Sequence, residues 1–246
     1  MMNKARTLAV TERVLRQLRH DHRTIGLVLV VPSLLMILLY YVYEDADAVF
    51  NAVAPLILGL FPFIIMFLVT SVAMLRERTA GTLERLMTLP VSKLDLLLGY
   101  AVAFGALALI QGTLASLVTT GLLGVDVDGG AWKLVMVAIL AGITGSASGL
   151  FFSAFAKTEF QAVQFMPAFV FPQLLTAGLL IPRDKMADWL QRLSDFLPLT
   201  YIVRAMKEVA GHKHWTDDLT RDIFIILLFA VGALVLGAAT LRRSHK

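Results

Sequence analysis

The chain has 246 residues, of which 58% are hydrophobic and only 16% are charged, and it contains no cysteine. About a quarter of a soluble domain is charged, so this composition excludes an ordinary soluble protein and predicts an all-α integral membrane protein with several spans. Disulfides and thiolate metal sites are excluded as well, and the net charge of +4 does not indicate nucleic-acid binding, because the charges lie in the segments between apolar runs.

Residues 7–23 are predicted to form an amphipathic helix. On a helical wheel the apolar side chains occupy one arc and the arginines occupy the opposite arc. This pattern is typical of a helix that lies flat in the inner headgroup region with its bases near anionic lipid. The alternative is an ordinary basic leader over 1–23 that only fixes the topology. The two arcs consist of Leu8, Val10, Val14, Leu15 and Leu18 on one side and Arg6, Arg13, Arg16, Arg19 and Arg23 on the other.

Six apolar segments follow, and each reaches the roughly 20 residues that a helix needs to cross a bilayer. They lie at about 24–43, 52–75, 94–123, 133–156, 160–182 and 222–241. We therefore expect a single six-span domain over 1–246, with an inner loop at 76–93 and a long outer segment at 183–221.

The distribution of basic residues predicts the orientation of the chain. Lysine and arginine gather in the leader, in 76–93 and in the C-terminal tail, whereas 44–51 and 124–131 hold acidic residues and no base. Since basic loops remain in the cytoplasm, both termini are expected there. Aromatic residues near the predicted outer boundary agree with this: Tyr40, Tyr41, Tyr43, Trp132, Trp189 and Trp215.

Two further patterns concern packing and the outer segment. Gly145 and Gly149, four residues apart in the fourth span, are expected to let two helices approach closely. In the outer segment, 186–197 and 199–209 each have one apolar side and are separated by Pro198. Two short amphipathic helices on the outer surface, or dipping into the membrane, fit this pattern better than disorder. His212 and His214 lie near Asp217 and Asp218, but a solvated loop explains them better than a metal site.

The sequence offers no evident energy source for transport. The interior of the spans contains no Asp, Glu, Lys, Arg or His, which argues against ion coupling. There is no Walker A motif and no catalytic constellation, so the chain is not expected to be an enzyme by itself. If it transports, its energy should come from another subunit.

The inner loop reads RERTAGTLERLMTLPVSK and has the signals of a short helix. Gly81 weakens helix propagation, Thr82 is a suitable N-cap, and Glu84 falls in the first turn, where the helix dipole favours an acid. Pro90 ends the helix. An exposed apolar face on such a helix suits docking into a groove of a soluble partner. The alternative is a merely soluble connecting loop.

The pattern R-E-R-x-x-G-T-L-E-R-L-x-x-x-P over 76–90 resembles the cytoplasmic signature of ABC-2 type permeases, the membrane subunits of type V ABC exporters. The stretch 171–209 is similar to the family's segment from span five through its outer re-entrant helices. Among relatives the chain looks most like bacterial drug-export permeases of the daunorubicin-resistance type.

The resemblance implies the following arrangement. The helix over 7–23 would be the elbow helix, and 76–93 would contain the coupling helix that contacts an ABC ATP-binding subunit, present in two copies. ATP and Mg would be bound by that subunit, with no cofactor on this chain. A second permease chain would pair with this one, as homodimer or heterodimer, in the bacterial cytoplasmic membrane. The implied coupling residues are Arg76, Glu77, Arg78, Gly81, Thr82, Glu84, Arg85, Leu86 and Pro90.

The resemblance also implies a central pathway along spans two and five and an outer gate. Aromatic and methionine side chains with sparse amides suit bulky amphiphiles. The alternatives are that these side chains face lipid or pack between helices, and that the amides lie at the cytoplasmic mouth. The pathway candidates are Phe61, Phe63, Met66, Phe67, Gln161, Gln164, Phe165 and Phe169, and the gate candidates are Pro198, Leu199, Thr200 and Tyr201.

The expected function is export of hydrophobic or amphiphilic compounds such as drugs, lipids or natural products. Two alternatives stay open, a polysaccharide or glycolipid exporter of the same superfamily and a non-transporting membrane module that docks and regulates a cytoplasmic protein. The sequence does not identify the substrate.

Overall fold

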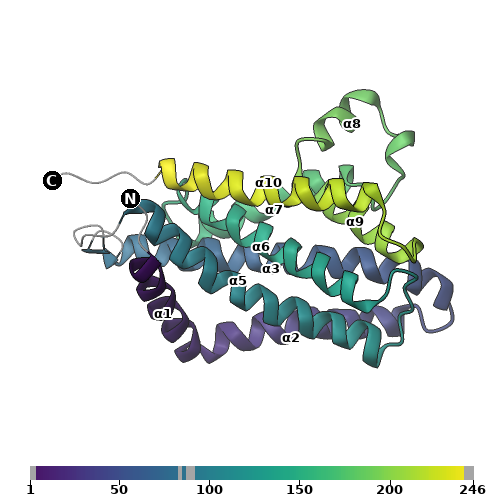
Figure 1. Ribbon diagram of the computed structural model, residues 1–246, viewed down its shortest axis with the longest axis horizontal. Helices are drawn as coiled ribbons and strands as arrows, with labels where there is room; N and C mark the ends of the chain where they lie inside the picture. The colour runs from purple at the N-terminus through teal and green to yellow at the C-terminus, as the bar shows by residue number, and fades with distance from the viewer. Residues whose placement is uncertain (1–3, 83–84, 87–91, 241–246) are drawn as a thin grey trace.

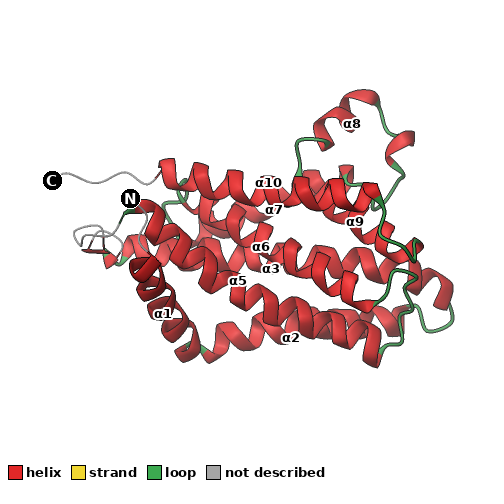
Figure 2. Ribbon diagram, viewed as in Figure 1, coloured by secondary structure: helices red, strands yellow, loops and turns green. Residues whose placement is uncertain are grey.

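The computed structural model describes residues 4–82, 85–86 and 92–240. Within these ranges the chain folds into helices and loops without a β-strand (Figure 2). The all-α prediction is confirmed.

Five helices of the described part are long and apolar enough to cross a membrane. They lie side by side along the long axis of the molecule (Figure 1). The longest is α3, with 33 residues, which begins before the predicted second span and continues beyond it. The five are α2 (His22–Val42), α3 (Asp47–Thr79), α5 (Lys93–Leu117) with a π-helical turn η1 (Val118–Leu122), α6 (Ala131–Ser153) and α10 (Asp217–Thr240).

The predicted fifth span corresponds to α7 (Glu159–Thr176), which is not among these five. Gln161, Gln164 and Gln173 lower its hydropathy. The helix also ends earlier than the predicted limit of 182, since Gly178 takes a left-handed conformation with φ of 83°. Nevertheless α7 packs against α3 within the bundle.

Shorter helices lie at the two ends of the bundle. Helix α1 (Lys4–His20) lies at the end where α10 finishes, and α8 (Asp188–Ser194) lies at the opposite end (Figure 1). A single 3₁₀ turn η2 (Arg183–Lys185) precedes α8, and α9 (Pro198–Gly211) follows it. Two helices are present where 186–197 and 199–209 predicted them, and Pro198 is the first residue of the second, a position that tolerates the missing N–H.

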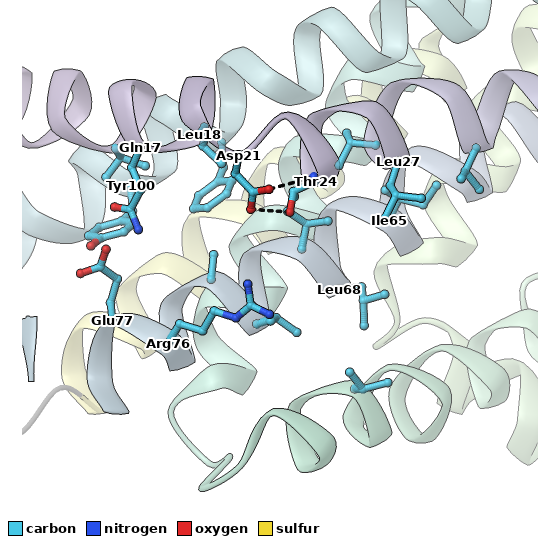
Figure 3. A pocket seen from close by; sticks show the side chains of 18 residues that line it. Gln17, Leu18, Asp21, Thr24, Leu27, Ile65, Leu68, Arg76, Glu77 and Tyr100 are labelled. Atoms are coloured by element: carbon cyan, nitrogen blue, oxygen red, sulfur yellow. Dashed lines mark hydrogen bonds between the residues drawn. The ribbon is translucent and has the colours of Figure 1, made fainter. Parts of the chain in front are cut away.

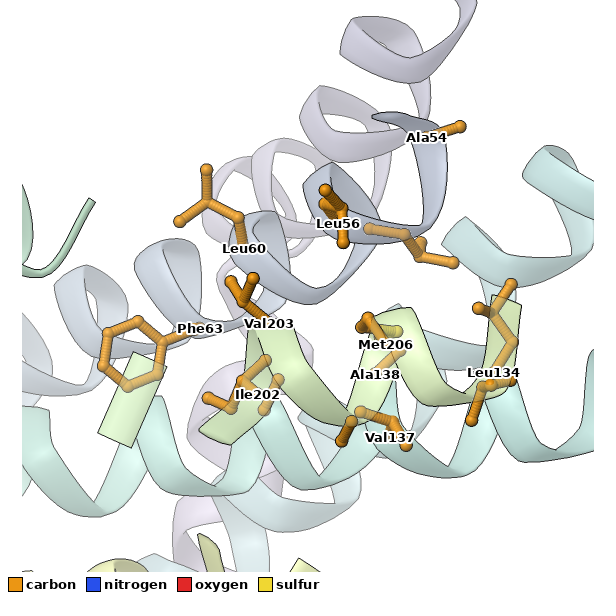
Figure 4. Close-up of a cluster of buried hydrophobic side chains, with 14 of the residues drawn as sticks. Ala54, Leu56, Leu60, Phe63, Leu134, Val137, Ala138, Ile202, Val203 and Met206 are labelled. Carbon is orange, nitrogen blue, oxygen red and sulfur yellow. The ribbon is translucent and has the colours of Figure 1, made fainter. Parts of the chain in front are cut away.

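Helix α9 is inserted into the bundle. Its residues Ile202, Val203 and Met206 are buried against α3 and α6, as Figure 4 shows. Met206 and Ile202 fill the space above Gly59 of α3. The apolar side of α9 is covered by α3, α6 and α10, which removes more of its apolar surface from water than the membrane interface would.

The pairing of α3 with α6 forms the centre of the bundle. A Cβ atom at Gly145 would collide with the carbonyl oxygen of Phe63, and one at Gly149 would collide with that of Phe67. The predicted role of the two glycines in close packing is therefore confirmed.

Helix α1 packs across the start of α5. Val10 and Val14 are buried there, and Val10 lies directly over Gly99. The hydroxyl of Thr11 donates to the carbonyl of Gly99 at 3.2 Å. By contrast, Leu8 is 64% exposed, so only part of the predicted apolar arc contacts the protein.

Candidate functional site

The charged end of α3 is the start of the predicted coupling stretch, and its first residue contacts α7. The guanidinium of Arg76 donates from Nε to Glu159 Oε1 at 2.8 Å and from Nη2 to Oε2 at 3.1 Å. Both side chains are more than half exposed. The bidentate geometry fixes the relative position of the two helix ends, although an exposed pair adds little to stability.

The second residue, Glu77, is buried and contacts α1. Both of its carboxylate oxygens accept from Arg13 Nη2, at 2.7 and 2.9 Å. Arg13 also donates from Nη1 to the hydroxyl of Tyr100 on α5 at 3.2 Å. Burial disfavours the charged guanidinium, but the hydrogen bonds to Glu77 and Tyr100 outweigh it and raise the pKa of Arg13 above its ordinary value.

The third residue, Arg78, contacts α6. Its Nη1 donates to the carbonyl oxygen of Ser153, the last residue of that helix, at 2.5 Å. A cation at this position satisfies a terminal carbonyl and interacts favourably with the helix dipole. Three consecutive side chains thus join the end of α3 to α7, α1 and α6.

The start of α5 is held to α1 by a contact that the sequence analysis missed. Ser92 and Asp95 form a capping box, with Ser92 Oγ accepting from Asp95 N at 3.0 Å and Asp95 Oδ2 accepting from Ser92 N at 3.2 Å. Thr7 of α1 donates to Asp95 Oδ1 at 3.4 Å. The spacing of Ser92 and Asp95 is a readable sequence signal, whereas the contact to Thr7 is not.

Two of the remaining predicted coupling residues, Glu84 and Pro90, lie outside the described residues. Gly81 has φ of 70° and ends α3, and its carbonyl accepts from the backbone N–H of Arg85 at 3.1 Å. Thr82 was expected to be the N-cap but is already helical, so the helix starts one residue earlier. Arg85 is exposed, and Leu86 packs partly against a buried cluster to which α1, α2, α3, α5 and α6 contribute.

The pathway candidates fall into two groups. Phe63, Met66 and Phe67 of α3 are fully buried, and the ring of Phe67 stacks on Phe169 of α7 at 5.6 Å between centroids. The ring centroid of Phe152 of α6 lies 4.5 Å from that of Phe169.

The other candidates are accessible or partly so. Gln161 and Gln164 are exposed, and Phe61 and Phe165 are partly buried. Gln161 Oε1 accepts from the backbone N–H of Lys157 at 2.8 Å, near the start of α7.

The gate candidates at the start of α9 contact α7 through a residue that the sequence analysis missed. Gln173 is fully buried, accepts from the N–H of Leu199 at 3.1 Å and donates to the carbonyl of Phe169 at 2.9 Å. Thr200 and Tyr201 donate from their hydroxyls to the carbonyls of Ser194 and Asp195, at 2.7 and 2.9 Å. A glutamine in an apolar segment is a weak signal, because its partner lies 26 residues away.

A groove of about 410 Å³ lies between α2 and α3, next to the charged end of α3 (Figure 3). Aliphatic side chains form most of its wall, and Arg76 and Glu77 lie at one end. Among the described residues no group of three or more His, Cys, Asp or Glu could hold a metal ion.

Comparison with known proteins gives a family and several relatives. The family model described as "ABC-2 type transporter" matches residues 5–210. The chain is 26% identical over 171 residues to "Probable multidrug ABC transporter permease YbhR" of Escherichia coli, covering 70% of this chain and 45% of the relative. It is 27% identical over 168 residues to "Linearmycin resistance permease protein LnrN" of Bacillus subtilis, covering 68% and 43%.

A eukaryotic relative is also similar. "ABC transporter G family member 20" of Dictyostelium discoideum is 26% identical over 169 residues, which cover 68% of this chain and 23% of the relative. In these three comparisons the match spans less than half the length of the relative.

Proposed function

Because the chain belongs to the ABC-2 type transporter family, and is a multi-pass membrane protein, we propose that it is the permease subunit of an ATP-driven exporter. A separate ATP-binding subunit, in two copies, supplies the energy and holds the ATP and Mg. The observation that carries the proposal is the set of contacts at the end of α3, where Arg76, Glu77 and Arg78 join the predicted coupling loop to α7, α1 and α6.

These contacts give the loop a mechanical role. A force applied to the loop by the ATP-binding subunit reaches α3 directly and reaches α1, α6 and α7 through the three side chains. The α3–α6 pair moves as one body, because Gly145 and Gly149 bring the two backbones into contact. Arg85 is exposed, and in this proposal it contacts the ATP-binding subunit.

The pathway follows from the position of α7. The rings of Phe67, Phe152 and Phe169 pack together, and Phe152 and Phe169 also line a cavity of about 280 Å³ next to Pro198. We expect α7 to separate from α3 and α6 during transport, so that these rings become more accessible to a hydrophobic substrate. The pair of Arg76 with Glu159 holds one end of α7, and the contact of Gln173 with Leu199 holds the other.

The topology in the membrane is part of the proposal. Helix α7 serves as the fifth of six spans, α1 lies at the inner surface as the elbow helix, and both termini are cytoplasmic in a bacterial inner membrane. The α8–α9 segment forms the outer re-entrant structure and its gate. A second permease chain completes the pathway. The names of the relatives, multidrug and linearmycin resistance permeases, support hydrophobic or amphiphilic substrates.

The proposal is tested with the complex of this chain and its ATP-binding subunit in proteoliposomes. The double substitution Glu84→Ala plus Arg85→Ala should abolish substrate-stimulated ATP hydrolysis and export of a lipophilic dye while the protein still inserts. Arg16→Ala is the control, because Arg16 is an exposed basic residue of α1 that pairs with Glu12.

Three outcomes would contradict the proposal. Unchanged export in the double variant would remove the coupling role from these residues. An ATPase that is regulated without export of any compound would identify a docking module. Export of a polysaccharide but not of lipophilic dyes would assign the chain to the other substrate class.

A further inference from the structure

The groove between α2 and α3 is a candidate ligand site that the family assignment does not specify, and the inference drawn from it rests on the proposed export function. Its volume of about 410 Å³ is in the range of small-molecule sites. It is open on one side, and its walls come from α2 and α3 with contributions from α1, α5 and α7. It does not include the packed rings of Phe67, Phe152 and Phe169.

The groove has an apolar length and a polar end. Leu27, Ile65 and Leu68 line the apolar part, and Figure 3 shows them well separated from the charged side chains. The charged lining residues are Asp21, Arg76 and Glu77; in the same view Asp21 and Arg76 lie near each other in the middle, and Glu77 lies beside Tyr100 at the far end. A molecule with a hydrocarbon or aromatic body and one polar group matches this arrangement.

Two of the three charges are already neutralised by partners. Glu77 accepts both of its charged hydrogen bonds from Arg13, and Arg76 donates two to Glu159. These pairs leave Asp21 as the remaining charge of the lining.

Asp21 is held by neutral donors. Its Oδ1 accepts from the backbone N–H of Thr24 at 3.1 Å and its Oδ2 from the hydroxyl of Thr24 at 2.6 Å. These hydrogen bonds hold the pKa of Asp21 below its ordinary value, with Arg76 and Arg23 adding longer-range attraction, so the carboxylate is ionised at neutral pH. Each oxygen keeps acceptor capacity for a further donor.

We propose that this groove binds an amphiphile with a protonated amine, whose ammonium group contacts Asp21 and whose apolar body lies along Leu27, Ile65 and Leu68. An amine can donate to the carboxylate at the edge of an apolar wall, where a charge-assisted hydrogen bond is stronger than in water. A carboxylate-bearing amphiphile would instead be repelled by Asp21 and would have to displace Glu159 from Arg76.

The test is photolabelling of the full chain in lipid nanodiscs with an alkylamine that carries a diazirine on its chain. Labelled peptides should come from α2 and α3 around Leu27 and Ile65, and unlabelled dodecylamine should compete. Asp21→Asn should weaken that competition by about tenfold or more, as expected for loss of a charge-assisted hydrogen bond. Asparagine is also a good N-cap, so α2 should still begin at the same place.

Two further variants separate the site from general effects. Ile65→Trp fills the apolar part and should abolish labelling of the groove whatever the state of Asp21. Glu12→Gln, which removes an exposed carboxylate of α1 that does not line the groove, should leave labelling unchanged.

The proposal is overturned if dodecanol competes as well as dodecylamine, since the groove would then accept any alkyl chain. It is also overturned if labelling is spread equally over α10, or if Asp21→Asn has no effect. Binding is measured without the ATP-binding subunit, so a groove that labels as expected in a complex that exports nothing would refute only the exporter function. Export without labelling of the groove would refute only this inference.

Discussion

Removal of the Arg13 side chain should destabilise the protein far more than the partly exposed position of this residue on α1 indicates. Arg13→Ala leaves the Glu77 carboxylate without its charged partner, and only 5% of that side chain is exposed. Breaking a buried pair from one side costs about 3–5 kcal/mol. Because 32% of the Arg13 side chain is exposed, we expect a value near the lower limit, about 3 kcal/mol.

The other variants of this pair should cost less. Glu77→Gln should cost about 1–2 kcal/mol, since the partly exposed guanidinium can reach water. The double substitution Arg13→Leu plus Glu77→Leu should recover most of the loss, because apolar residues can replace a buried ion pair without a large penalty. That double variant should nevertheless lose substrate-stimulated ATP hydrolysis, because α1 is no longer held to the end of α3.

The assay is thermal or denaturant unfolding of the purified chain in detergent, with ATP hydrolysis measured on the complex. Arg16→Ala is the matched control, as its exposed pair with Glu12 contributes no more than about 0.5 kcal/mol. The reasoning is refuted if Arg13→Ala is no more destabilising than Arg16→Ala, or if the double leucine variant is as unstable as Arg13→Ala.

Two predictions concern glycines. Gly149→Ala should lower stability by about 1–3 kcal/mol, because its Cβ collides with the carbonyl of Phe67. Gly105→Ala should be neutral, since apart from the adjoining backbone of its own helix no atom lies within 4 Å of the added Cβ; equal melting temperatures of the two variants would disprove the close contact of α3 and α6. Gly81→Ala should cost about 1 kcal/mol, because φ at this position is 70°, whereas Gly26→Ala should not, and faster hydrogen exchange at 76–82 in Gly81→Ala alone is the expected result.

The elements of the fold that could be predicted from the sequence are those fixed by local composition. Long apolar runs predicted α2, α3, α5, α6 and α10, since a membrane helix must satisfy its own backbone hydrogen bonds. The spacing of Gly145 and Gly149 identified the close helix contact, because this signal depends only on small residues about one turn apart.

Local composition could not predict which side of each membrane helix faces the interior of the protein. In a bilayer both the lipid-facing and the buried side chains are apolar, so periodicity does not tell which side of α3 is buried. Phe63 and Phe67 lie in the core, whereas Ile65 and Leu68 line the groove, although all four side chains are apolar.

The partners of the coupling stretch were also beyond the sequence. Glu77 was identified as part of the stretch, but Arg13 lies 64 residues away and was interpreted as one of several lipid-facing bases. The same holds for Arg76 and Glu159, which are 83 residues apart. Such pairs depend on how helices pack, and a single sequence carries no signal for them.

The pair of Arg76 with Glu159 offers the most direct test of the claim that the end of α3 transmits movement to α7. The pair is exposed, so its reversal should change stability little, and a loss of function cannot be attributed to unfolding. Substrate exported per ATP hydrolysed should be measured in proteoliposomes for Arg76→Glu, Glu159→Arg and both together. We predict a severalfold loss in each single variant and recovery in the double variant; single variants as efficient as the unaltered chain would contradict the claim.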